Sequence, residues 1–88
     1  MARKFVDYSY VDRLIYHRER CTKMRSMLDN GKKLTRDQMQ KYHYSDGFLI
    51  GCGGATVSDV HAKGIVNASV DAGVLAGNRA KRAWLKGK

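Results

Sequence analysis

The chain has 88 residues, and 43% of them are hydrophobic, which allows one small domain and argues against a fully disordered chain. Lys and Arg number 17 against 8 Asp and Glu, so the formal net charge is +9 and a polyanionic partner is expected. The two cysteines do not form a disulfide framework, and no apolar segment is long enough for a signal peptide or a transmembrane helix. We therefore expect one cytoplasmic domain over residues 1–88, with frayed basic termini and no membrane contact.

A first helix is predicted over about residues 9–29, with Ser9 as its N-cap. Apolar residues recur there at spacings of three and four, which is typical of a buried helical face. This face consists of Tyr10, Leu14, His17, Cys21, Met24 and Leu28, and it is widened by Val11 and Met27. A second face of the same helix is basic and carries Arg13, Arg20 and Lys23.

Asn30 and Gly31 are expected to end this helix, because glycine adopts the left-handed conformation at low cost. Lys32 and Lys33 follow in the turn. Thr35 is then suited to cap a second helix over about residues 36–50, with Gln38 at the capping-box position. A short turn between two helices favours an antiparallel hairpin.

Residues 46–78 hold seven of the nine glycines and form the expected close-packed centre of the domain. The run from Gly51 to Gly54 is expected to interrupt the second helix, because each glycine costs about 1 kcal/mol relative to alanine there. The alternative is a tight crossing inside a longer helix. The four-residue spacing of Gly47 and Gly51 suits that alternative, since it lets helix backbones approach.

The segment after Thr56 has two interpretations. Its valines and alanines recur every three or four residues, which favours a Gly/Ala-rich third helix over about residues 58–85. Apolar and other residues also alternate over 68–74, which is typical of a strand. We therefore predict a mostly α fold, a helical hairpin plus a third helix, with an α+β fold carrying a strand around residues 64–75 as the alternative.

No catalytic or metal-binding pattern stands out. Cys21, Cys52 and the three histidines are residue types of a Cys–His site, but His17 and Cys21 lie on the apolar face and are interpreted as core. Paired Cys-x-x-Cys and His-x-x-x-His motifs are missing, so no metal and no cofactor are expected. The glycine run lacks the lysine of a phosphate-binding loop, and Thr56 replaces the last glycine of a dinucleotide fingerprint. We therefore do not expect an enzyme.

The basic residues interleave with aromatic ones, a pattern that suits nucleic acids because cations meet phosphates and rings stack on bases. The leading hypothesis is a non-enzymatic, oligomeric protein that binds DNA or RNA. The expected phosphate contacts are Arg13, Arg20, Lys23, Lys32, Lys33, Arg79, Lys81 and Arg82, and the expected base contacts are Tyr42, Tyr44 and Trp84.

Two alternatives remain open. One is a protein that sequesters a small anionic nucleotide at a subunit interface near the glycine run. The other is a viral or mobile-element accessory protein that inhibits a host enzyme through protein–protein contact. Homo-oligomerisation is expected because small residues let a second helix approach, within the chain or from another copy; these are Ala68, Ala72, Gly73, Ala76, Gly77 and Ala80.

Overall fold

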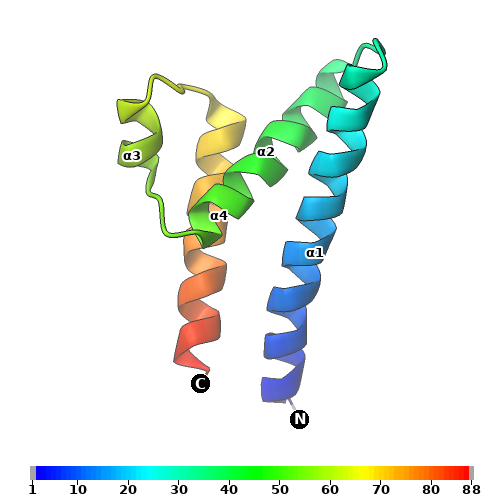
Figure 1. Ribbon diagram of the computed structural model, residues 1–88. Coiled ribbons are helices and arrows are strands. Elements are labelled where there is room, and N and C mark those ends of the chain that lie inside the picture. Colours follow the sequence, from blue (N-terminus) through cyan, green and yellow to red (C-terminus); the bar gives the residue numbers. More distant parts are fainter. Residues whose placement is uncertain (1, 88) are drawn as a thin grey trace.

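The structure, a computed structural model, describes the backbone of residues 2–87 and the side chains of residues 10–87. Its order is α1 (Ala2–Asp29), α2 (Arg36–Cys52), α3 (Val57–Ala62) and α4 (Ala68–Lys86), as Figure 1 shows. The mostly α prediction is confirmed. The strand alternative is wrong, because residues 64–75 form a turn, a linker and the start of α4. The expectation of frayed termini concerns in part Met1 and Lys88, which lie outside the described residues.

Helix α1 begins earlier than predicted. It starts at Ala2, so Ser9 lies inside the helix and is not its N-cap. The physical reason is that residues 2–9 contain neither proline nor glycine, and nothing in them stops the helix from extending. The helix ends at Asp29 as predicted, and Gly31 has a φ of 79° in the turn.

Helix α2 begins with the predicted capping box. The Gln38 amide donates to Thr35 Oγ1 at 3.1 Å, and the Thr35 amide donates to Gln38 Oε1 at 2.9 Å. The helix then runs antiparallel to α1 and crosses between α1 and α4 in Figure 1. It continues through Gly51 to Cys52, two residues beyond the predicted end, and the expected interruption by the glycine run occurs at Gly53, which caps the helix.

The crossing of α2 and α4 explains why Gly51 stays helical. Four glycines lie where these helices meet, and a Cβ added to any of them would overlap a backbone carbonyl oxygen of the other helix. The overlapping pairs are Gly47 with Val70, Gly51 with Val74, Gly73 with Tyr44 and Gly77 with Phe48. Because backbone meets backbone, the contact compensates for the low helix propensity of glycine.

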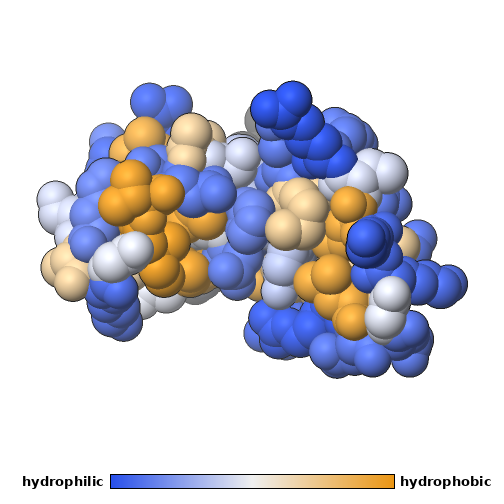
Figure 2. Space-filling model, turned by 90° about the horizontal axis from the view of Figure 1, so that it is seen from above, coloured by the Kyte–Doolittle hydropathy of each residue, from blue (hydrophilic) through white to orange (hydrophobic). Residues whose placement is uncertain are grey.

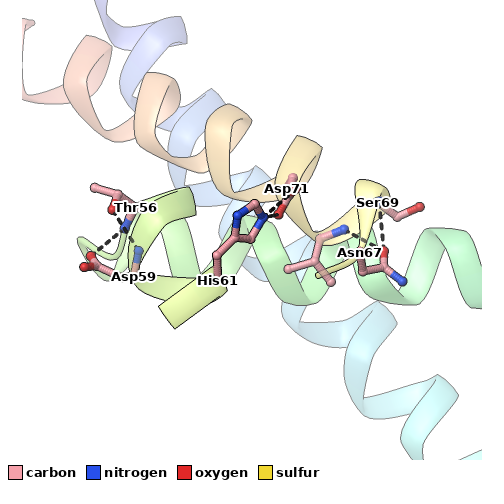
Figure 3. Close-up of polar contacts among 7 residues, drawn as sticks. Thr56, Asp59, His61, Asn67, Ser69 and Asp71 are labelled. Carbon is pink, nitrogen blue, oxygen red and sulfur yellow. Dashed lines mark hydrogen bonds and ion pairs between the residues drawn. The ribbon is translucent and has the colours of Figure 1, made fainter. Parts of the chain in front are cut away.

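The predicted third helix is divided in two. Helix α3 ends at Ala62, and Gly64 follows with a φ of 86°. Helix α4 then begins at Ala68 and is capped by Asn67, whose side-chain oxygen accepts from the amides of Ser69 and Val70 at 2.9 and 3.1 Å (Figure 3). A glycine turn followed by an asparagine cap therefore outweighs the helix propensity of the valines and alanines around it.

Polar contacts cap the start of α3 and join its end to α4 (Figure 3). Thr56 and Asp59 form a capping box at the start of α3, and hydrogen bonds from Thr56 lower the pKa of the Asp59 carboxyl. Near the end of α3, His61 Nε2 lies 2.9 Å from Asp71 Oδ2 of α4. The short helix is thus tied at its end to the first turn of α4.

Two apolar clusters make up the core. One joins α1, α2 and α4 and contains Tyr10, Phe48, Cys52 and Ala80; the other joins α2, α3 and α4 and contains Val60, Val70 and Val74.

The predicted α1 face is buried at Tyr10, His17, Cys21 and Met24. Leu28 and Val11 are instead 39% and 45% exposed, which corrects their assignment to that face. Leu28 lies beside the exposed turn after α1, and Val11 lies about 100° around the helix from Tyr10.

A candidate anion-binding groove

A groove of about 360 Å³ lies where α1, the first half of α2 and the start of α4 meet. Two of the predicted contact residues, one cation and one aromatic, are brought together in it. Its lining consists of Arg20 from α1, Asp37, Gln40, Lys41 and Tyr44 from α2, and Ala68, Ser69 and Ala72 from α4. We call this set of eight residues the groove.

The Arg20 side chain is held in place by two neighbours. One terminal nitrogen donates to Ser45 Oγ at 3.3 Å, and the other donates to the Tyr16 hydroxyl. The guanidinium carbon also lies 4.6 Å from the centre of the Tyr16 ring. A guanidinium has five N–H donors in a rigid plane, so Arg20 keeps donors beyond these two contacts for an anion.

Ser45 links Arg20 to a buried histidine. Its hydroxyl lies 2.8 Å from His17 Nδ1, and both side chains are buried, Ser45 fully. Burial, together with the smaller effect of the nearby Arg20 and Arg13 charges, lowers the pKa of His17 to about 4. The ring is therefore neutral, and Ser45 Oγ accepts from Arg20 and is hydrogen-bonded to His17 Nδ1.

This Ser–His distance is that of a nucleophile and its base. No substrate reaches Ser45, however, because its exposed fraction is 0%. The pair is instead a polar support for Arg20. Sequence reasoning missed Ser45, although a histidine on the apolar face of a helix needs a buried hydrogen-bond partner, and that need was the available signal.

Tyr44 forms the aromatic part of the groove. Its ring centroid is 5.7 Å from that of His17, and its carbonyl oxygen packs against Gly73 of α4. The opposite wall is made of small side chains from α4, namely Ala68, Ser69 and Ala72. The ring therefore borders open space and is not covered by a bulky residue from α4.

The charge of the groove is lower than the composition suggests. Lys41 Nζ lies 3.0 Å from Asp37 Oδ2, one helical turn apart, and both side chains are largely exposed. Arg20 and Lys41 supply two positive charges and Asp37 one negative charge, which leaves +1. Because Asp37 offsets Lys41, Arg20 is the principal cation for an incoming anion.

The other predicted basic residues do not line the groove. Arg13 lies on the same side of α1 as Arg20, with its guanidinium carbon 4.9 Å from the centre of the Phe48 ring. Lys81 of α4 is half-buried. The remaining predicted cations are exposed on α1, on the turn before α2 and on α4; they are Lys23, Lys32, Lys33, Arg79 and Arg82.

The other two predicted aromatic residues are engaged elsewhere. A hydrogen bond with Tyr42 raises the pKa of Arg25. Trp84 stacks on Tyr10, with ring centroids 4.8 Å apart and planes 14° apart, and it packs against the core. Tyr44 is thus the predicted aromatic contact that lines the groove.

Over the described part of the chain, no group of three or more His, Cys, Asp or Glu side chains is arranged to hold a metal ion. Within residues 2–87, no helix has the length and apolar character needed to cross a membrane. Exposed apolar surface is nevertheless present. Figure 2 shows it in two areas separated by polar surface, one on the α3 side and one over the end of the molecule where α1 meets α2.

The chain was compared with known proteins by sequence and by structure. It matches no protein-family model, and neither a curated protein nor a solved structure is significantly similar to it.

Proposed function

We propose that this protein is a small, non-enzymatic nucleic-acid-binding protein and that the groove is its binding site. The observation that carries the proposal is that Arg20 and Tyr44, from two different helices, line the same cavity. A guanidinium pairs with phosphate through charge-assisted hydrogen bonds, and an aromatic ring stacks on a base. The formal net charge of +9 supports the proposal, because it attracts a polyanion to the surface around the groove.

A binding titration at several salt concentrations tests this function. We expect a fluorescently labelled oligonucleotide to bind with a logarithm of the affinity that falls linearly with the logarithm of the salt concentration, since bound cations release counterions. Arg20→Ala should weaken binding and reduce the magnitude of that slope by about 0.7 for a single strand. Fluorescence anisotropy measures both quantities.

Arg18→Ala is the matched control. It removes the same charge from the same helix at an exposed position that does not line the groove. An equal loss of affinity in both variants would show that the total charge of the chain determines the affinity, and not a positive charge in the groove. Affinity that does not change with salt would contradict nucleic-acid binding altogether.

A second candidate function is sequestration of a small anionic nucleotide. The volume of the groove supports it, because about 360 Å³ lies within the range of about 300–1,000 Å³ that is common for small-molecule sites. This function requires saturable binding at a fixed stoichiometry and a weaker dependence on salt. Native mass spectrometry of the purified protein tests it, since a retained nucleotide adds a discrete mass of a few hundred daltons.

Homo-oligomerisation and a cytoplasmic location belong to the same proposal. Large hydrophobic side chains that remain exposed, such as Val66 at 78% and Leu85 at 53%, support contact with a second copy. Two free cysteines, Cys21 and Cys52, support a reducing compartment. Native mass spectrometry also reports the number of chains, and a monomer over the working concentration range would contradict oligomerisation.

A further inference from the structure

We infer that the groove accepts one unpaired nucleotide of a nucleic-acid strand, with its base against Tyr44 and its phosphate on Arg20, so that the protein prefers single strands to duplexes. This inference rests on the proposed function and specifies its ligand class. It combines three observations: the size of the groove, the fixed positions of the two side chains, and the place of the one carboxylate in the lining.

The first observation is the space. The groove holds about 360 Å³, near the lower end of small-molecule sites, and α4 contributes only Ala68, Ser69 and Ala72 to its wall. A single flat base with its sugar fits this volume. In a duplex the bases are stacked inside the helix, so a duplex presents phosphates to Arg20 but no base to Tyr44.

The second observation is that both contact groups are fixed before the ligand arrives. Arg20 is held by Ser45 and Tyr16, and Tyr44 lies against His17 on a helix whose backbone touches α4. Side chains that are already ordered lose less conformational entropy on binding. The pair is therefore suited to a ligand that offers a phosphate and an exposed base together.

The third observation concerns the place of the phosphate in the groove. Asp37 lies in the lining with Lys41, and its carboxylate repels a phosphate. The phosphate is therefore directed to Arg20, which lies against Ser45 of α2 and Tyr16 of α1. Gln40 and Ser69 also line the groove and supply hydrogen-bonding groups that suit the polar edge of an unpaired base.

Three oligonucleotides of one length test the inference: a single strand, its duplex, and a single strand with abasic sites. We expect the single strand to bind roughly tenfold tighter than either of the others, because base stacking on one aromatic ring is worth about that factor. Tyr44→Leu should remove the preference, and Tyr44→Phe should keep it, because the ring is retained.

Tyr42→Leu is the matched control, since Tyr42 lies on the same helix two residues away and does not line the groove. It should keep the preference. Circular dichroism of each variant shows that the helices are retained, and the strand with abasic sites, which is tested on the unmodified protein, keeps the test decisive if Tyr44→Leu unfolds.

The outcomes separate the inference from the proposed function. Equal affinity for all three oligonucleotides, with Arg20→Ala weakening each of them, would overturn the inference and leave nucleic-acid binding in place. Displacement of the strand by a free nucleoside monophosphate at the same nucleotide concentration would overturn it in favour of a free nucleotide. If none of the oligonucleotides binds at low salt, the proposed function fails as well.

Discussion

The backbone of Gly73 in α4 lies directly against the carbonyl oxygen of Tyr44 in α2, with no room for a Cβ atom between them. Gly73→Ala should therefore destabilise the fold by about 1–3 kcal/mol, because backbone cannot move aside as a flexible side chain does. The higher helix propensity of alanine, worth about 1 kcal/mol, is not expected to compensate. Urea unfolding followed by circular dichroism measures the change.

Gly53→Ala is the control for this prediction. Gly53 is exposed and has a right-handed φ of −77°, and an added Cβ would meet only carbonyl oxygens of its own helix end, the nearest at 3.3 Å. Its loss of stability should be clearly smaller than that of Gly73→Ala. Similar losses at the two positions would mean that the α2–α4 contact does not limit the size of residue 73.

The glycine crossing also marks the limit of prediction from sequence. The spacing of Gly47 and Gly51 indicated a close helix contact, but it named neither the partner helix nor its register. Local signals were more informative, because Thr35 with Gln38 and the glycine at position 31 act within a few residues. The break at Gly64 was missed because the apolar period continues across it, although glycine followed by Asn67 was a readable signal.

His17 should make stability depend on pH. Its pKa is lowered from 6.5 to about 4 in the folded protein, mainly by burial. Between these values the unfolded chain binds a proton that the folded chain does not, so stability is full above about pH 6.5 and falls as the pH drops toward 4. The full effect is on the order of 3 kcal/mol. Urea unfolding at both ends of this window measures it.

A direct check is the titration of the His17 ring by NMR. The variant His17→Gln should reduce the difference in stability between the two ends of the window. A His17 ring that titrates near 6.5 in the folded protein would contradict its burial and the effect of the nearby Arg20 and Arg13 charges.

Both thiols should be unreactive in the native protein. Cys21 and Cys52 are 6% and 9% exposed, and burial raises the pKa of each thiol. Cys52 Sγ also lies 3.6 Å from the carbonyl oxygen of Gly77. A thiol reagent should therefore modify the native protein slowly and both cysteines rapidly in denaturant, since the thiolate is the reactive form. Rapid modification of either cysteine without denaturant would contradict its place in the core.

Asp37→Asn should strengthen binding of an oligonucleotide. The change removes the carboxylate from the groove and releases Lys41 from its ion pair. We expect roughly threefold tighter binding at low salt, in line with the strength of exposed charge pairs, and a smaller gain as salt is added. Fluorescence anisotropy measures this gain.

Asp12→Asn is the control for the effect of net charge, because Asp12 is exposed on α1 and does not line the groove. An equal gain in the two variants would show that the total charge of the chain, and not Asp37, sets the affinity. Weaker binding by Asp37→Asn would place the phosphate elsewhere.

The groove was only partly visible in the sequence. Arg20 and Tyr44 were predicted as contacts, but their meeting depends on how α1 packs against α2, which no local pattern encodes. Trp84 was also predicted as a base contact, yet it stacks on Tyr10. A basic residue next to an aromatic residue in the sequence does not show whether the ring is buried or exposed, because buried and exposed rings both recur at the helical period.

The two sides of the groove differ in stiffness. Tyr44 belongs to α2, which is locked backbone to backbone against α4, so these two helices behave as one piece. Arg20 belongs to α1, which packs on α2 through side chains such as His17, whose ring lies against Phe48. The position of the Tyr44 ring is therefore set by contact between two backbones, whereas the position of Arg20 is set by contact between side chains of α1 and α2.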